Sequence, residues 1–250
     1  MMSGKGRDGR CHKHELEKKN YNKPFTCDGC KQEGFGSRYR CHHCDYELHE
    51  ECKIQEPTIS HDFFPGCSFR FHLQPPTRCG DSRCKKHARC CDACGKDVHG
   101  YVYHCPDKGW DLHPCCTNLK TKFCIDGTHF LLRDGVFSNC YWCKKKKRGS
   151  SKVRGWSYVS ECRKYHFHVN CVGKMAQEAW KWKEGDEDDD LCMALEKTMD
   201  LKVLAKYSKP SRDRGNKFWK TAWMLLQAIL GIILGDPTTM AISLVNLLSQ

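Results

Sequence analysis

The feature that most constrains this chain is the cysteine pattern of residues 24–52, which read PFTCDGCKQEGFGSRYRCHHCDYELHEEC. Two C-x2-C pairs are separated by ten residues, and an H-x2-C pair follows the second after four more. Two thiolates spaced in this way can hold one tetrahedral ion from a single tight turn, so the pattern predicts zinc rather than disulfides or reactive thiols. The potential ligands are Cys27, Cys30, Cys41, Cys44, His49 and Cys52.

The order of these ligands narrows the class of zinc module. RING and PHD fingers share part of the spacing, but they need a further C-x2-C pair soon after the H-x2-C pair. The next such pair is Cys91 and Cys94, far downstream. The sequence therefore disfavours both of those alternatives.

Composition indicates a row of small modules in a reducing compartment. The chain has 21 cysteines among 250 residues, and small zinc modules take their folding energy from metal binding, about 10 kcal/mol or more per structural site. An odd cysteine count and a polar start, MMSGKGRDGR, without a signal peptide favour the cytosol or nucleus, or the cytosolic face of endomembranes.

The formal net charge of +12 overstates how basic the metal-loaded protein would be. A filled Cys3His site adds two positive charges and creates three thiolates, a net change of minus one. Five or six filled sites would lower the charge to roughly +6 or +7.

A resemblance emerges from the residues around the first cysteines. His14 stands thirteen positions before Cys27, within the run His12-Lys-His14-Glu-Leu16. Tyr39 lies two residues before Cys41, and the second C-x2-C pair leads into Tyr46-Glu-Leu48-His49. Together these features resemble the divergent C1 (DC1) domain of plant Cys/His-rich proteins.

The resemblance implies small zinc-stabilised α+β modules, each with short antiparallel strands and one short helix, and two interleaved zinc ions per module. One ion would take Cys27, Cys30, His49 and Cys52. The other would take His14, Cys41, Cys44 and a late ligand. The family places a cysteine eight residues after Cys52, where this chain has Ser60, so the neighbouring His61 is the expected substitute.

The pattern of C-x2-C followed by H-x2-C recurs from Cys91 and from Cys140, which predicts an array of repeats and four to six Zn²⁺ ions. In the second repeat Lys108 occupies the position matching Cys44, and in the third Tyr165 stands where a fourth cysteine is expected. The candidate ligands of these two repeats are Cys91, Cys94, Cys105, His113, Cys116, Cys124, Cys140, Cys143, Cys162, His168 and Cys171.

The predicted organisation has seven parts. A disordered start (1–10) precedes the first repeat (11–61), and a linker with an edge strand (62–89) separates it from the second repeat (90–125). A degenerate third repeat (126–175) follows. A helix with acidic and basic linkers (176–216) then leads to a hydrophobic helical hairpin (217–250).

The sequence of the tail, residues 217–250, predicts a helical hairpin rather than a membrane-spanning helix. Residues 222–234 carry only Gln227 as a polar residue, but 13 helical residues reach about 20 Å, and a bilayer core needs about 30 Å. Packing on protein and insertion into a membrane interface both stay open, because a basic run over 202–220 would attract anionic lipid.

The sequence does not favour catalysis. It contains no H-E-x-x-H motif, nucleophile elbow or phosphate loop, and the recognisable metal sites are four-ligand sets, so we expect no enzyme activity. The resemblance implies a zinc-stabilised adaptor for a protein or lipid partner in intracellular signalling. Diacylglycerol is a doubtful ligand, because residues 31–40 lack a bulky apolar tip.

Two other functions stay open. A basic strip over 144–156, ending at Trp156, could contact nucleic acid, although charge runs are usually solvated loops and the aromatic residues beside the ligands more simply pack the small cores. The tail, and family members linked to vacuolar and endosomal function, suggest an endomembrane-associated factor.

Overall fold

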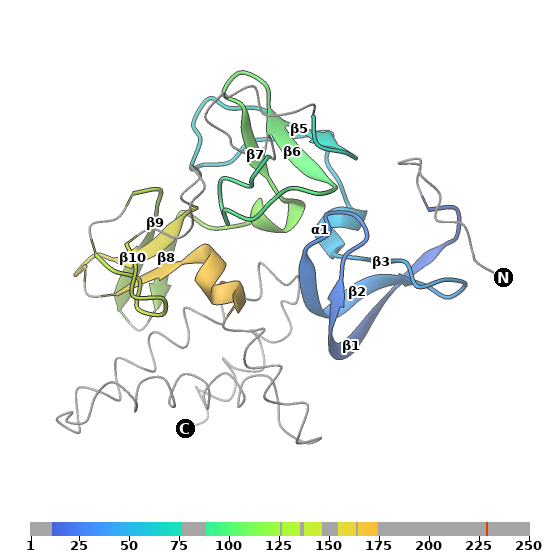
Figure 1. Cartoon of the computed structure of the whole chain (residues 1–250), viewed down its shortest axis with the longest axis horizontal. Helices are drawn as coiled ribbons and strands as arrows, with labels where there is room; N and C mark the ends of the chain where they lie inside the picture. Colours follow the sequence, from blue (N-terminus) through green and yellow to red (C-terminus); the bar gives the residue numbers. More distant parts are fainter. Residues whose placement is uncertain are drawn as a thin grey trace.

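The computed structural model describes residues 12–76, 89–125, 127–135, 138–146, 155–163, 165–174 and 229. Within these ranges the chain forms three antiparallel sheets of short strands, one after another along the sequence (Figure 1). The helical hairpin predicted over 217–250 and the linkers over 176–216 lie outside the described residues, apart from Ile229.

The first sheet has the order β1-β2-β3 and holds the first cysteine cluster. Its strands are β1 (Leu16–Thr26), β2 (Glu33–Cys41) and β3 (Glu47–Leu48), and the short helix α1 (Glu50–Lys53) follows. A bulge between Asn20 and Pro24 interrupts the pairing of β1 with β2. Phe25 and Phe35 are buried beside the cysteines, which provides the small apolar core that the aromatic pattern predicts.

The second sheet has the order β4-β5-β6-β7 and draws its first two strands from upstream of the C-x2-C pair formed by Cys91 and Cys94. Its strands are β4 (Thr58–Ile59), β5 (Phe69–His72), β6 (Val102–Cys105) and β7 (Trp110–Leu112), followed by the 3-10 helix η1 (Pro114–Cys116). The strand predicted near Phe69 therefore forms. It is an inner strand rather than an edge strand, because it pairs with β4 on one side and β6 on the other.

The third sheet has the order β11-β10-β9-β8. Its strands are β8 (Lys122–Ile125), β9 (Thr128–Arg133), β10 (Ser157–Ser160) and β11 (His166–His168), and residues 169–174 are helical. The pairing of β8 with β9 places Cys124 in this sheet, and not in the second module, where the sequence pattern put it. The modules are thus rich in strands and contain little helix.

The same tight turn begins the metal-binding part of each module. The first cysteine donates its N–H to the carbonyl five residues later, and the residue four positions on donates back to the first cysteine. That fourth residue has a positive φ in every copy, which favours glycine but is met by lysine twice. The residues are Lys31 (φ 61°), Gly95 (φ 69°) and Lys144 (φ 59°).

The modules share one continuous core. Tyr101 donates its N–H to the Gly29 carbonyl at 2.9 Å, which joins the second module to the first. Trp156 of the third module donates its N–H to the Ala93 carbonyl at 2.7 Å, and its ring contacts those of Phe63 and Phe64. Most buried apolar side chains of the described residues accordingly belong to a single cluster with members from all three modules.

Candidate metal centres

The structure brings cysteines and histidines together in four clusters of four side chains among the described residues. In each cluster the potential ligand atoms lie within 4.8 Å of one another. We call the first cluster the outer cluster and the other three the inner clusters. Their members are His12, His14, Cys41 and Cys44; Cys27, Cys30, His49 and Cys52; Cys91, Cys94, His113 and Cys116; and Cys140, Cys143, His168 and Cys171.

The distances between ligand atoms fit tetrahedral zinc. A sulfur at about 2.3 Å and a nitrogen at about 2.0–2.1 Å from a tetrahedral ion are about 3.5 Å apart. The Nδ1 atoms of His49, His113 and His168 lie 3.4, 3.3 and 3.4 Å from the sulfurs of Cys30, Cys94 and Cys143. Sets of three thiolates and one imidazole suit Zn²⁺, so these residues would hold zinc as a structural ion.

In two of the inner clusters, electrostatics favour the thiolate form of one cysteine, whereas contacts with neighbouring sulfurs raise the pKa of Cys116. Hydrogen bonds from Cys116 and Cys91 lower the pKa of the Cys94 thiol. In the third module a hydrogen bond from Cys171 lowers the pKa of Cys140 to about 3, against the opposing effect of burial. Both clusters therefore contain a sulfur biased towards the metal-binding state.

The second imidazole nitrogen distinguishes the inner clusters from one another. His113 Nε2 lies 3.2 Å from the Asp97 carbonyl, and His168 Nε2 lies 3.3 Å from the Lys146 carbonyl. Each ring therefore donates from Nε2 and presents Nδ1 to the metal, and such a bond fixes the ligand's orientation. His49 differs, because its Nε2 is buried without a hydrogen-bond partner.

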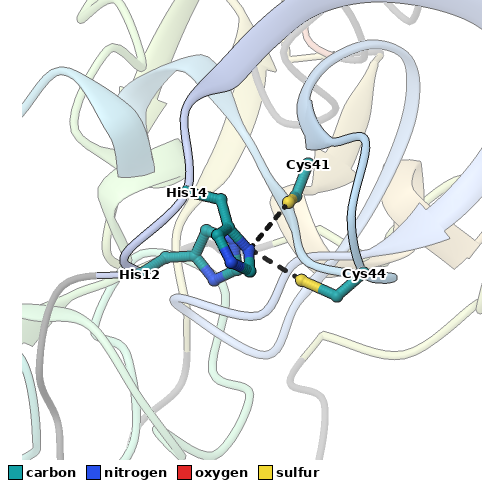
Figure 2. Close-up of side chains that lie close together, drawn as sticks. All are labelled: His12, His14, Cys41 and Cys44. Carbon is teal, nitrogen blue, oxygen red and sulfur yellow. Dashed lines mark hydrogen bonds between the residues drawn. The ribbon is translucent and has the colours of Figure 1, made fainter.

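The outer cluster is the one that lies nearest to solvent. Figure 2 shows its two histidines facing the cysteines from the segment before β1, with His14 Nδ1 3.5 Å from Cys41 Sγ and His12 Nε2 3.5 Å from Cys44 Sγ. Cys44 is exposed, whereas Cys41 is buried. The His12 ring stacks on Tyr46 with centroids 4.3 Å apart, which holds it towards the site.

His12 is a residue that the ligand assignment from the sequence missed, although the alternation in His12-Lys-His14 gave a signal. Residues 13 and 14 form a bend before β1, and both rings face the two cysteines from it (Figure 2). The resemblance instead implied His61, and this is corrected: His61 does not lie in the cluster. It is 7% exposed and packs on Trp156 at 5.1 Å between centroids, because the chain has already passed into the second sheet.

Three further candidate ligands also lie outside the four clusters. Cys105 ends β6 and is buried, with its thiol in hydrogen-bonding contact with Cys67. Cys124 and Cys162 are exposed, and the Cys162 sulfur lies 3.2 Å from the Ser160 hydroxyl. Backbone pairing explains the last case: Ser160 donates its N–H to Tyr165 as Cys41 does to Tyr46, so Ser160 takes the place of Cys41.

Occupied clusters would change the charge less than the sequence count suggested. Three Cys3His clusters would each contribute minus one and the Cys2His2 cluster nothing, which lowers the formal +12 to about +9.

Cys115 lies between two of the inner clusters, with its thiol in contact with Cys116 and Cys30. The first two modules therefore place their metal centres side by side.

Fold and clusters together define a Cys/His-rich, zinc-binding protein built from small β-rich modules in tandem. Comparison with known families agrees for the first module: residues 10–53 match the model described as C1 domain, so this part of the chain is similar to C1 domains. The resemblance inferred from the sequence is thereby confirmed over those residues.

Comparison with individual proteins gives one short match. The chain is 42% identical over 45 residues to a protein described as probable nucleoredoxin 1 from Arabidopsis thaliana. The match covers 18% of this chain and 8% of the length of that relative. No solved structure matches the chain.

Proposed function

We propose that this protein is an interaction adaptor on the cytosolic side of the cell, that its zinc ions are purely structural, and that it has no enzyme activity. The observation that carries the proposal is that each described cluster supplies four protein ligands. Catalytic zinc keeps a coordination position for water or substrate. A full set of protein ligands leaves no such position.

The first module offers the best candidate surface for a partner. Its strands β1 and β2 have 11 and 9 residues, whereas most other strands of the described chain have two to four. β1 lies at the edge of its sheet, so its outward backbone groups are available to pair with an added strand. Lys19 and Lys23 are exposed along it, which favours an acidic protein segment over an apolar one.

Cobalt substitution tests the structural role of the metal. Co²⁺ in a saturated Cys3His site gives tetrahedral absorption that added cyanide or azide leaves unchanged, and this is the expected result. A spectrum that shifts on addition of either ligand would reveal an open position and would contradict the proposal.

Capture experiments test the adaptor role. We expect the zinc-loaded full chain to retain a defined set of proteins from extracts of its own cells, and Lys23→Glu to lose them while keeping its zinc. Lys53→Glu, an exposed lysine on α1, is the matched control. Equal capture by all three proteins would contradict the proposed surface.

Flotation with phosphatidylserine vesicles separates a lipid partner from a protein partner. Binding of the purified full chain to these vesicles, and not to phosphatidylcholine vesicles, would favour lipid, and its loss on removal of residues 217–250 would assign that binding to the tail. Among the described residues no helix is long and apolar enough to cross a membrane. The endomembrane alternative therefore depends on residues outside the described ranges.

The nucleic-acid alternative requires an exposed aromatic residue beside the basic strip, and Trp156 is buried. Trp156 is 2% exposed and its ring lies against His61, Phe63 and Phe64, so it offers no face on which a base could stack. Residues 147–154 of the basic strip lie outside the described residues. The adaptor role is therefore the function that the geometry supports best.

A further inference from the structure

The second module contains a counterpart of the outer cluster, and the sheet register identifies its members. In the first module Leu16 pairs with Cys41, and the ligand His14 lies two residues before Leu16. In the second module Arg70 pairs with His104, so one step further along the same register Phe69 faces Cys105. Cys67 lies two residues before Phe69 and thus takes the place of His14.

Lys108 completes the correspondence. It lies three residues after Cys105, as Cys44 lies three after Cys41. Its ammonium group acts on the Cys67 thiol, and it stands where the outer cluster has a thiolate. A fixed positive charge at a ligand position opposes the binding of a cation. Burial and the contact with Cys105 raise the pKa of the Cys67 thiol, and Lys108 partly offsets that rise.

The two sulfurs left at this place are in contact with each other. The Cys67 and Cys105 thiols interact directly, and the two residues are 7% and 0% exposed. They belong to none of the four clusters found among the described residues. A structural zinc site needs four ligands, whereas a disulfide needs two sulfurs, here one from the segment before β5 and one from the end of β6.

We propose that Cys67 and Cys105 form a reversible dithiol–disulfide site, which a peroxide oxidises without loss of the zinc ions. The thiolate of one cysteine attacks a peroxide oxygen, the O–O bond breaks and water leaves, which gives a sulfenic acid. The second thiol then attacks that sulfur, the S–O bond breaks and a second water leaves. Two thiols and one hydrogen peroxide thus become one disulfide and two waters.

The expected consequence is a covalent link between the segment that precedes β5 and the end of β6. Segment 60–68 carries Phe63 and Phe64, which pack on Trp156. A disulfide at its end would therefore fix the junction between the second and third modules. A thiol reductant such as glutathione would restore the dithiol.

Peptide mapping of the zinc-loaded full chain tests the proposal. The protein is treated with hydrogen peroxide, free thiols are blocked with N-ethylmaleimide, and non-reduced peptides are identified by mass spectrometry while released zinc is measured. We expect a Cys67–Cys105 cross-linked peptide, two hydrogens lighter than its components, to accumulate before zinc is released. Lys108→Gln should slow its formation.

Matched variants distinguish a redox site from a metal site. Cys67→Ser should retain the zinc content of the wild type and lose only the cross-link. The exposed thiols Cys124 and Cys162 serve as controls, since each should be blocked singly. Zinc content one ion lower in Cys67→Ser, or alkylation of Cys67 and Cys105 as separate thiols after zinc release has begun, would overturn the proposal.

Discussion

The imidazole of His49 lies directly against the α-carbon of Gly34. A β-carbon at position 34 would come within 2.4 Å of His49 Nε2 and 2.5 Å of the Phe25 ring. Because both rings are buried, Gly34→Ala should displace the metal ligand and destabilise the first module by about 1–3 kcal/mol. Chemical denaturation and competition for zinc with a chromogenic chelator would measure the loss.

Gly173→Ala is the matched control for this prediction. A β-carbon there meets nothing within 4 Å, and residue 173 is helical, so alanine should be neutral or stabilising. Zinc affinity equal in Gly34→Ala and wild type would show that the ring has room to move and would contradict the packing described here.

The docking of the first two modules depends on Gly100. A β-carbon at this position would lie 2.0 Å from the Gly29 carbonyl oxygen, which accepts the Tyr101 N–H. Gly100→Ala should therefore separate the modules and leave their zinc sites filled. Faster hydrogen exchange at the Tyr101 amide with an unchanged zinc count is the expected result, and an unchanged exchange rate would count against it.

The metal-binding turns make a prediction about backbone conformation. Gly95 has a φ of 69°, so Gly95→Ala should cost about 1 kcal/mol of stability, the typical penalty for an L-residue in this region. Lys31 already pays that penalty at 61°, so Lys31→Gly should not destabilise its module. Denaturant titrations of the zinc-loaded variants would measure the change in unfolding free energy for each. An equal loss of stability in Gly95→Ala and Lys31→Gly would contradict the turn conformation that the modules share.

His61 gives the described junction a pH dependence. Burial lowers the pKa of its imidazole, and its Nδ1 accepts the Phe63 N–H. Because the unfolded pKa is about 6.5, this group contributes full stability above that pH. The contribution is lost as the pH falls, since the unfolded chain takes up the proton first.

His61→Phe should therefore weaken the pH dependence of unfolding between pH 7.5 and 5.5. The wild type is the reference, because acid release of zinc affects both proteins alike. Identical slopes of unfolding free energy against pH would show that His61 is not buried as described.

The inner clusters could be predicted from the sequence because their ligands are local. Each C-x2-C pair lies in one tight turn and each H-x2-C pair at the start of a short helical segment, so spacing alone identifies them. The antiparallel strands between them then need only bring the C-x2-C pair and the H-x2-C pair of one module together. The same reasoning located the first module as a C1-type domain.

The outer ligands could not be predicted as well, because strand pairing decides them. Counting residues after Cys52 pointed to His61, but β4 and β5 carry that segment into the second sheet. Likewise Cys162 matches a ligand by spacing, while the register gives its position to Ser160. The membership of a strand in a particular sheet depends on contacts between modules, which a local motif does not encode.

Zinc stoichiometry of the purified full chain, with His12→Asn and His61→Asn beside it, is the most direct test of the account. Four described clusters predict at least four zinc ions per chain. His12→Asn should lose one ion and His61→Asn none. Three or fewer ions in the wild type, or loss of an ion from His61→Asn alone, would contradict the assignment of the outer cluster and the four-site account built on it.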